Sequence, residues 1–245
     1  MKRPPQAKTH AEYQDYNTAY ATTGGAAMEK AADDFAAKYP ASELRPYLYA
    51  KAMHEYQNEN QPAKMLAMGE KVLALDPDNT VALVLTATVL SDQLSDTDAG
   101  RQQQKIAEIK KNATRALDTI GAAYVPPAHA TAEQITAYKS TLESMAHSAL
   151  GIMDLKLGDY SGSEKELQAA ADLGKAQPDA YVWYHLALSQ DHQNKYAAAL
   201  SSVNQALQYT RSGSDLETLA RGERDRLIKL TGAAQAQPNS SQPPR

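Results

Sequence analysis

Two stretches of the chain share one pattern: residues 150–170 read LGIMDLKLGDYSGSEKELQAA, and residues 186–206 read LALSQDHQNKYAAALSSVNQA. Both begin with a leucine and a small residue, and both carry a tyrosine ten positions after that leucine. The matched positions are 36 residues apart, as Leu150 and Leu186 or Tyr160 and Tyr196 show. A fixed period of this length indicates an internal repeat, and such a repeat determines the fold class.

The repeat continues toward the N-terminus in a less regular form. Tyr39-Pro40-Ala41-Ser42 and Asp76-Pro77-Asp78-Asn79 place their prolines 37 residues apart. The segment that starts between them keeps the internal spacing of the later copies at Tyr49, Ala52, Met53, Tyr56, Met65, Val72 and Pro77.

Helix-forming residues fill the segments between these markers, while glycine and proline fall mainly in the gaps. Four capping boxes, at Thr9–Glu12, Thr131–Gln134, Ser161–Glu164 and Ser214–Glu217, predict helix starts. Glycines at positions 121, 158, 174, 213 and 232 predict helix ends. The predicted helices span residues 9–22, 26–39, 43–58, 62–75, 79–94, 102–120, 131–157, 161–173, 179–193, 196–210 and 215–230.

One segment permits a second interpretation. Residues 81–90, VALVLTATVL, are rich in β-branched side chains and could form a buried strand. No second candidate strand is available to pair with it, so we expect a buried helix. The segment is too short and too rich in threonine to span a bilayer.

The pattern resembles the tetratricopeptide repeat (TPR) at Trp183, Leu186-Ala187, Asn194-Lys195-Tyr196, Ala199 and Ala206, and residues 73–79, LALDPDN, are similar to its closing segment. The resemblance covers residues 9–210, is strongest over 43–79 and 147–210, and is interrupted by an insertion at 95–104. It implies an all-α, TPR-like α-solenoid of about five helix pairs, with a C-terminal capping helix over 215–230. We expect the repeat domain to span 9–231, flanked by disordered segments at 1–8 and 232–245.

Small residues explain how such pairs pack. Gly151, Ala187, Ala199 and Ala206 would allow helix backbones to approach closely, while Leu150, Leu186, Tyr160 and Tyr196 would fill the space between pairs. Each pair alone leaves an apolar face exposed, and stacking buries it. In the last helix Leu216, Leu219, Leu227 and Leu230 lie beside charged residues, as a cap with one wet face requires.

Composition excludes several function classes. The 245 residues include 25 Lys and Arg against 29 Asp and Glu, a net charge of −4, whereas nucleic-acid-binding surfaces are usually strongly basic. Cysteine is absent, which excludes thiol catalysis, disulfides and cysteine-ligated metals. Tyrosine supplies 14 of the 16 aromatic residues, so many rings should keep one edge in water.

The N-terminus leaves the compartment open. The start Met1-Lys2-Arg3 is basic, but no apolar segment of the signal-peptide type follows it. As written, the chain reads as cytoplasmic. If it is a processed form, it would be exported or periplasmic, a possibility with which the lack of cysteine agrees.

The chain contains no complete catalytic or metal motif. His54-Glu55 begins like a zinc-protease motif, but Asn58 stands where the second histidine should be. Asp96, Asp98 and Gly100 suggest a calcium loop without its final glutamate. Residues 158–162, GDYSG, lack the order of a nucleophile elbow. We therefore expect no catalytic residues, no metal and no cofactor.

In the register of the TPR family, the first helix of each pair lines an inner groove, and the resemblance assigns fourteen positions to it. They are Tyr47, Lys51, His54, Asn58, Thr88, Asp92, Ser148, Ile152, Lys156, Tyr181, Tyr184, His185, Leu188 and His192. Alternatively, Tyr181 and Tyr184 pack against the neighbouring pair. The family's clamp for C-terminal carboxylates is missing, because Ala50, His54, Tyr184 and Leu188 occupy its positions.

These features predict a non-catalytic module that binds a peptide or a helix of a protein partner in the groove. Two alternatives remain. Because Tyr39-Pro40-Ala41-Ser42 resembles the repeat closings of bacterial outer-membrane assembly lipoproteins, the chain could be a cell-envelope assembly component, or a self-associating scaffold. It could also be an enzyme built on helical repeats. The partner's identity and the oligomeric state stay open.

Overall fold

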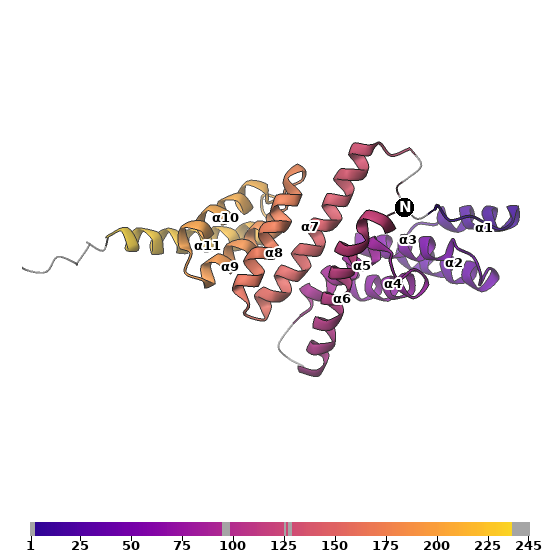
Figure 1. The fold of residues 1–245 in the computed structure, drawn as a ribbon, viewed down its shortest axis with the longest axis horizontal. Coiled ribbons are helices and arrows are strands. Elements are labelled where there is room, and N and C mark those ends of the chain that lie inside the picture. Colours follow the sequence, from indigo (N-terminus) through magenta and orange to yellow (C-terminus); the bar gives the residue numbers. More distant parts are fainter. Residues whose placement is uncertain (1–2, 95–98, 125, 127–128, 237–245) are drawn as a thin grey trace, which may run out of the picture. The chain divides into compact units, whose positions relative to one another are not determined.

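The structure, a computed structural model, describes residues 3–94, 99–124, 126 and 129–236. Within these residues the chain forms eleven α-helices and one short 3-10 helix, and it contains no strand (Figure 1). The elements are α1 (His10–Tyr20), α2 (Gly25–Lys38), α3 (Arg45–Asn58), α4 (Pro62–Leu75), α5 (Thr80–Asp92), α6 (Ala99–Ala123), α7 (Ala132–Lys156), α8 (Tyr160–Leu173), η1 (Gly174–Ala176), α9 (Ala180–His192), α10 (Tyr196–Tyr209) and α11 (Asp215–Ala236).

The all-α, solenoid-like fold is therefore confirmed. Residues 81–90, the possible strand, lie inside α5, and nine residues of that helix are buried. Two helices are longer than predicted, since α6 begins at Ala99 and α11 continues to Ala236. Gly121 and Gly232 consequently lie within helices, where they face open space and do not end the element.

The turns inside three of the helix pairs have the same geometry. Asn60, Gly158 and Asn194 adopt positive φ angles of 55°, 80° and 60°. In each turn the next residue donates its N–H to the carbonyl five positions earlier, at 2.9 Å. This is the Schellman arrangement, in which a left-handed residue ends one helix and the next helix starts two residues later. The repeat seen in the sequence is thus also a repeat of backbone conformation.

The links between pairs repeat as well. Asp76 and Gln177 precede prolines and have nearly the same non-helical backbone angles, with φ of −140° and −141° and ψ of 86° and 78°, because a proline disfavours helical geometry in the residue before it. Two or three residues later a side chain caps the next helix: Asn79 accepts from the N–H of Ala82 at 3.1 Å, and Asp179 accepts from that of Tyr181 at 2.8 Å.

One predicted cap is wrong. Thr131 and Gln134 form a complete capping box, and Thr9 and Ser214 accept from the expected backbone N–H groups. Ser161, however, lies inside α8, and the cap is Asp159, whose carboxylate accepts from the N–H of Gly162 at 2.9 Å. The Schellman turn at Gly158 places the helix start two residues earlier than the box suggested.

The chain divides into two compact units, residues 1–149 and 150–245, and α7 contributes to both. In the first unit each helix from α1 to α6 packs against the next (Figure 1). A Cβ atom at Gly25 would lie 2.3 Å from Tyr56 Cδ1, and one at Gly69 would lie 2.4 Å from Thr86 Cγ2. These glycines bring α2 close to α3 and α4 close to α5, around a core that includes Met28, Leu48, Met53, Met68 and Val72.

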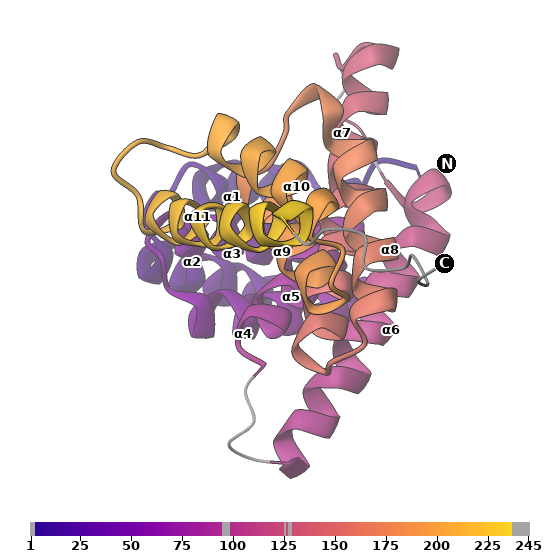
Figure 2. The ribbon, with the colours of Figure 1, turned by 90° about the vertical axis from the view of Figure 1, so that its left-hand side faces the viewer.

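The second unit confirms the predicted small-residue contacts. A Cβ atom at Gly151 would lie 2.6 Å from Leu167 Cγ, and Ser163 Oγ donates to the Gly151 carbonyl at 2.7 Å. Ala187, Ala199 and Ala206 are fully buried where α9, α10 and α11 pack together (Figure 2).

Helix α11 buries one face, as a cap should, but with fewer leucines than predicted. Ala220 and Leu227 are fully buried against the other members of that core. Leu219 is 55% exposed and belongs to the outer face, because the buried stripe passes through Ala220 and Leu227 and leaves position 219 outside. The expected tail beyond residue 236 lies outside the described residues.

Candidate peptide-binding surfaces

A groove of about 380 Å³ in the first unit brings together residues from α1, α3, α5 and α6. We call it the tyrosine groove. Its lining residues are Tyr16, Tyr20, Tyr47, Ala50, Lys51, His54, Glu55, Asp76, Asn79, Thr80, Val81, Ala123 and Tyr124. Three of the predicted groove residues, Tyr47, Lys51 and His54, therefore meet at one surface.

Three of the groove's tyrosines are not among the positions predicted from the repeat pattern. Tyr16 and Tyr20 lie one turn apart on α1, with ring centroids 5.5 Å from each other, and Tyr124 directly follows α6. The spacing of Tyr16 and Tyr20 was visible in the sequence, but the repeat pattern is weak over 9–42. Position 124 lies beyond the predicted end of its helix, so no register could be assigned to it.

Lys51 joins α3 to the end of α1. Its ammonium group donates to the Tyr20 carbonyl and, at 2.8 Å, to the Thr22 carbonyl. The same group lies 4.9 Å from the centroid of the Tyr20 ring, a cation–π distance. A cation at a helix C-terminus satisfies carbonyls that lack partners within the helix. Lys51 thus holds the Tyr20 backbone and leaves that ring 46% exposed.

The tyrosines of this unit fall into two groups. Outside the groove, the hydroxyl of Tyr49 donates to Asp33 at 2.8 Å and that of Tyr56 donates to Glu29 at 2.6 Å. Burial and the Glu29 carboxylate raise the pKa of Tyr56 to about 12. Tyr39 is paired in the same way with Asp15, at 2.5 Å.

The groove tyrosines differ, because their hydroxyls have no hydrogen-bond partner among the described residues. This holds for Tyr16, Tyr20, Tyr47 and Tyr124. None of the four hydroxyl oxygens is buried, so each can be reached from the solvent. Burial raises the pKa of Tyr16 and of Tyr47, so both keep their protons at neutral pH. The groove therefore offers aromatic faces together with phenol donors that a ligand could use.

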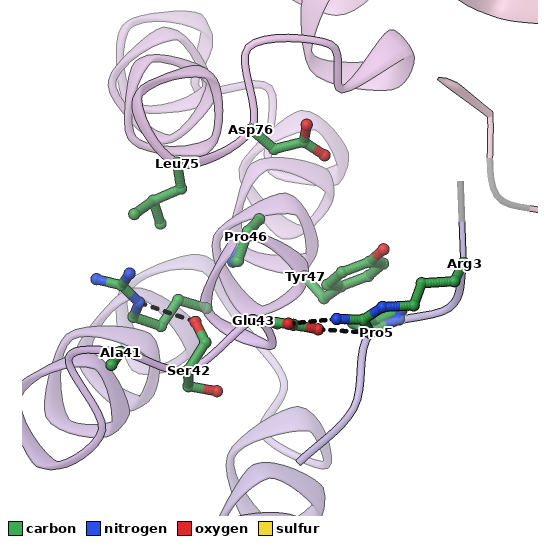
Figure 3. Close-up of a pocket in the computed structure, with 10 residues that line it drawn as sticks. Arg3, Pro5, Ala41, Ser42, Glu43, Pro46, Tyr47, Leu75 and Asp76 are labelled. Atoms are coloured by element: carbon green, nitrogen blue, oxygen red, sulfur yellow. Dashed lines mark hydrogen bonds and ion pairs between the residues drawn. The ribbon is translucent and has the colours of Figure 1, made fainter. Parts of the chain in front are cut away.

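A second recess, of about 410 Å³, adjoins the groove and shares Tyr47 and Asp76 with it (Figure 3). Composition predicts no structure for residues 1–8, yet Arg3 and Pro5 line this recess. The Arg3 guanidinium donates to both Glu43 oxygens, at 2.8 and 2.6 Å. This ion pair holds the N-terminal segment against the turn that precedes α3.

The other predicted groove residues of this unit lie elsewhere. Thr88 and Asp92 line a separate cavity of about 350 Å³ with the apolar side chains of Met65, Val89 and Met145. His54 is exposed, and its Nδ1 lies 3.3 Å from Gln57 Oε1. Asn58 is exposed at the end of α3 and is not among the residues that line the tyrosine groove.

In α7 the predicted inner positions are largely buried. Ile152 is 1% exposed and packs with Leu167 and Leu186, and Ser148 is also buried. Lys156 is exposed at the end of the helix. The assignment of Ile152 to an open groove is wrong, because α7 uses this position to pack the core of the second unit.

On α9 the predicted cluster separates into two contacts. The His185 ring lies 4.1 Å from the Tyr181 ring and 5.5 Å from the Tyr184 ring, between centroids, and its Nδ1 is 2.8 Å from the Tyr181 carbonyl. His192 instead stacks on Tyr160 of α8, with 4.2 Å between centroids and 6° between planes. The two histidines therefore have different ring partners, although seven residues separate them on one helix.

Tyr184 also belongs to the packing of its unit. It is partly buried and contacts the core formed by Ala187, Ala199, Val203 and their neighbours on α11. Burial, and then the charge of Glu223, raise the pKa of Tyr184. Leu188 is partly exposed on the same helix. This placement agrees with the interpretation in which Tyr184 packs against the neighbouring pair.

The described residues contain no cluster of three or more histidine, aspartate or glutamate side chains arranged to hold a metal. Asp96 and Asp98, from the incomplete calcium motif, lie outside the described part of the chain. None of the described helices is both long enough and apolar enough to cross a membrane. Comparison with the models of known protein families gives no match, and comparison with curated proteins gives none.

Proposed function

We propose that this protein is a non-catalytic binding module of the TPR type, and that the tyrosine groove receives a peptide segment of a protein partner. The TPR assignment is supported by the 36-residue period, by the three identical turns at Asn60, Gly158 and Asn194, and by close packing at Gly151. In such an arrangement the first helices of successive pairs line one surface. Most of the groove residues agree with this, since they come from α1, α3 and α5, while Ala123 and Tyr124 come from the end of α6.

One observation carries the proposal: four tyrosines converge on one groove with hydroxyls that have no partner among the described residues. A tyrosine buries a large area with few rotatable bonds, which makes it a frequent binding hot spot. Two charged side chains of the groove have internal roles. Lys51 binds backbone carbonyls, and Glu55 accepts from the N–H of Gly24 at 3.0 Å. The hydroxyls of the four tyrosines and of Thr80 lack hydrogen-bond partners among the described residues, and of these residues only the tyrosines also offer a large aromatic surface to a ligand.

The proposal is tested by selecting peptides from a displayed library of random sequences on the full-length chain. Selected peptides are then titrated against wild type and Tyr20→Ala. Because Tyr20 lines the groove and is 46% exposed, we expect its loss to weaken binding by about tenfold or more without changing the melting temperature.

Tyr13→Ala is the matched control. Tyr13 lies on the same helix, is 54% exposed and does not line the groove. Peptides that bind wild type and both variants equally would place the binding surface elsewhere, and a library that yields no binder would contradict a peptide-binding function.

A further inference from the structure

We infer that the ligand of the tyrosine groove is an extended, proline-rich segment that carries an arginine, and that the recess beside Tyr47 binds that arginine. The inference rests on the proposed function and adds the chemical class of the partner. Three observations support it: the unpaired hydroxyls, the shared lining of the two cavities, and the position of the chain's own segment Arg3-Pro4-Pro5.

The hydroxyls of the groove match the backbone hydrogen-bonding needs of a proline-rich segment. A polyproline II segment has no internal hydrogen bonds, so all its carbonyls need donors when it is bound. Proline supplies no N–H of its own, so such a segment presents acceptors without matching donors. The groove offers the reverse, since the phenols of Tyr16, Tyr20, Tyr47 and Tyr124 are donors without partners among the described residues. Proline-rich segments are known to dock in aromatic-lined grooves of this kind.

The carboxylate of Glu43 offers a binding site for an arginine at one end of this surface. Glu43 lies in the turn that precedes α3 and accepts two hydrogen bonds from Arg3 in the parallel geometry that a guanidinium makes with a carboxylate (Figure 3). The N–H of Gln6 also approaches Glu43, at 3.4 Å. Pro5 lines the same recess as Tyr47. The chain thus already shows how a proline next to an arginine fits at this end of the surface.

The recess and the tyrosine groove form one continuous surface. Tyr47 and Asp76 line both the recess and the groove, so a ligand whose arginine is at Glu43 can extend past Tyr47 toward Tyr16 and Tyr20. Residues 3–6 then act as an internal competitor for the recess. A partner must displace Arg3 from Glu43, and this exchange needs little energy because an exposed ion pair contributes little to stability.

The test uses the full-length protein and three labelled nonapeptides: eight prolines followed by arginine, nine prolines, and a glycine–serine sequence of equal length ending in arginine. Binding is measured by fluorescence anisotropy. We expect the first peptide to bind most tightly, nine prolines to bind several-fold more weakly, and the glycine–serine peptide not to saturate at any concentration used. Tyr20→Ala should weaken the first peptide about tenfold or more, and Tyr13→Ala should leave it unchanged.

Two further variants test whether Glu43 binds the arginine of the peptide. Glu43→Gln should remove the difference between the peptides with and without arginine, and Arg3→Ala should tighten the arginine peptide by freeing Glu43. Melting curves of all variants confirm that the fold is intact. Equal affinity for the proline and glycine–serine peptides, or an equal loss in Tyr13→Ala and Tyr20→Ala, would overturn the inference.

The two proposals fail in different ways. If the random library yields peptides that depend on Tyr20 but contain no proline, the groove binds peptides and only the proline-rich assignment is wrong. If no selected peptide and no proline peptide depends on Tyr20, both proposals are wrong.

Discussion

At the residue scale, one amino acid has two roles in the first unit. Tyr49 and Tyr56 donate to the carboxylates of Asp33 and Glu29 and join α2 to α3. Tyr16, Tyr20 and Tyr47 leave their hydroxyls unpaired among the described residues and line a groove. The paired rings are structural, since a charge-assisted hydrogen bond of this kind is stronger than a neutral one. The unpaired rings are the better candidates for binding.

Tyr184 allows the two roles to be separated in the second unit. Tyr184 packs against the core that includes Ala187, Ala199 and Val203. Tyr184→Ala should therefore destabilise the protein by about 2 kcal/mol, which is less than the cost of truncating a fully buried aromatic residue because Tyr184 is only partly buried. The free energy of unfolding is measured by urea denaturation. Tyr209→Ala, at an exposed position on α10, should change it by less than about 0.5 kcal/mol.

If Tyr184→Ala leaves the unfolding free energy unchanged, the ring does not support the core. It would then be free for the binding role that the sequence analysis gave to Tyr181, Tyr184, His185, Leu188 and His192. If the variant loses stability, packing in the core is sufficient to explain why Tyr184 lies where it does, and no binding role is needed.

At the element scale, helix pairs are held together by close approaches at single small residues. Gly151→Ala should destabilise the protein by about 1–3 kcal/mol, because the new methyl group would lie 2.6 Å from Leu167 Cγ and 3.1 Å from the Leu167 backbone nitrogen. The backbone nitrogen cannot move aside without shifting α8. Urea denaturation followed by circular dichroism gives the change.

Gly222→Ala is the control for helix propensity. Gly222 lies inside α11 in the same unit and has no atom within 4 Å of the added methyl group. The substitution should therefore stabilise the protein by about 0.5–1 kcal/mol, since alanine favours a helix interior over glycine. If both variants shift stability in the same direction, crowding at Gly151 does not determine the packing of α7 and α8.

At the scale of the whole molecule, each of the two units is stabilised by contacts between helices that follow one another in the chain, as expected for helical repeats. The titration of buried tyrosines makes the free energy of unfolding depend on pH above about pH 10. The pKa of Tyr16, Tyr49 and Tyr56 is raised, in each case chiefly by burial. The folded state holds these protons more tightly than the unfolded chain does. Their contribution is complete below pH 10, the ordinary tyrosine value, and is lost as the pH rises.

We therefore expect the urea midpoint to fall between about pH 10 and pH 12. Tyr56→Phe should be less stable than wild type at pH 8, by about 1.5–3 kcal/mol, because it lacks the hydrogen bond to Glu29. The two proteins should converge toward pH 12, where Tyr56 itself loses its proton. A constant difference across this range would mean that Tyr56 does not titrate as its environment requires. Circular dichroism in a urea series provides the midpoints.

The helical fold, most helix boundaries and the small residues of the pair contacts could be predicted from the amino-acid sequence alone. These features depend on short-range chemistry: a left-handed residue after a helix, a proline that excludes helical geometry before it, and apolar residues at helical spacing. Such signals lie within a few residues of their effects, so a single chain displays them. The error at Ser161 arose where two local signals competed and the turn at Gly158 prevailed.

Which tyrosines share a surface, and which of them are paired with carboxylates, depends on how the helices pack. Tyr16 and Tyr47 come together because α1 and α3 pack in the same unit, and Arg3 reaches Glu43 across 40 positions of sequence. The choice between a paired and a free hydroxyl depends on whether a carboxylate on another helix faces it, as Glu29 faces Tyr56. These relations depend on the angle and register at which helices pack, and no local pattern encodes them, because every helix offers several faces on which the same residue could lie.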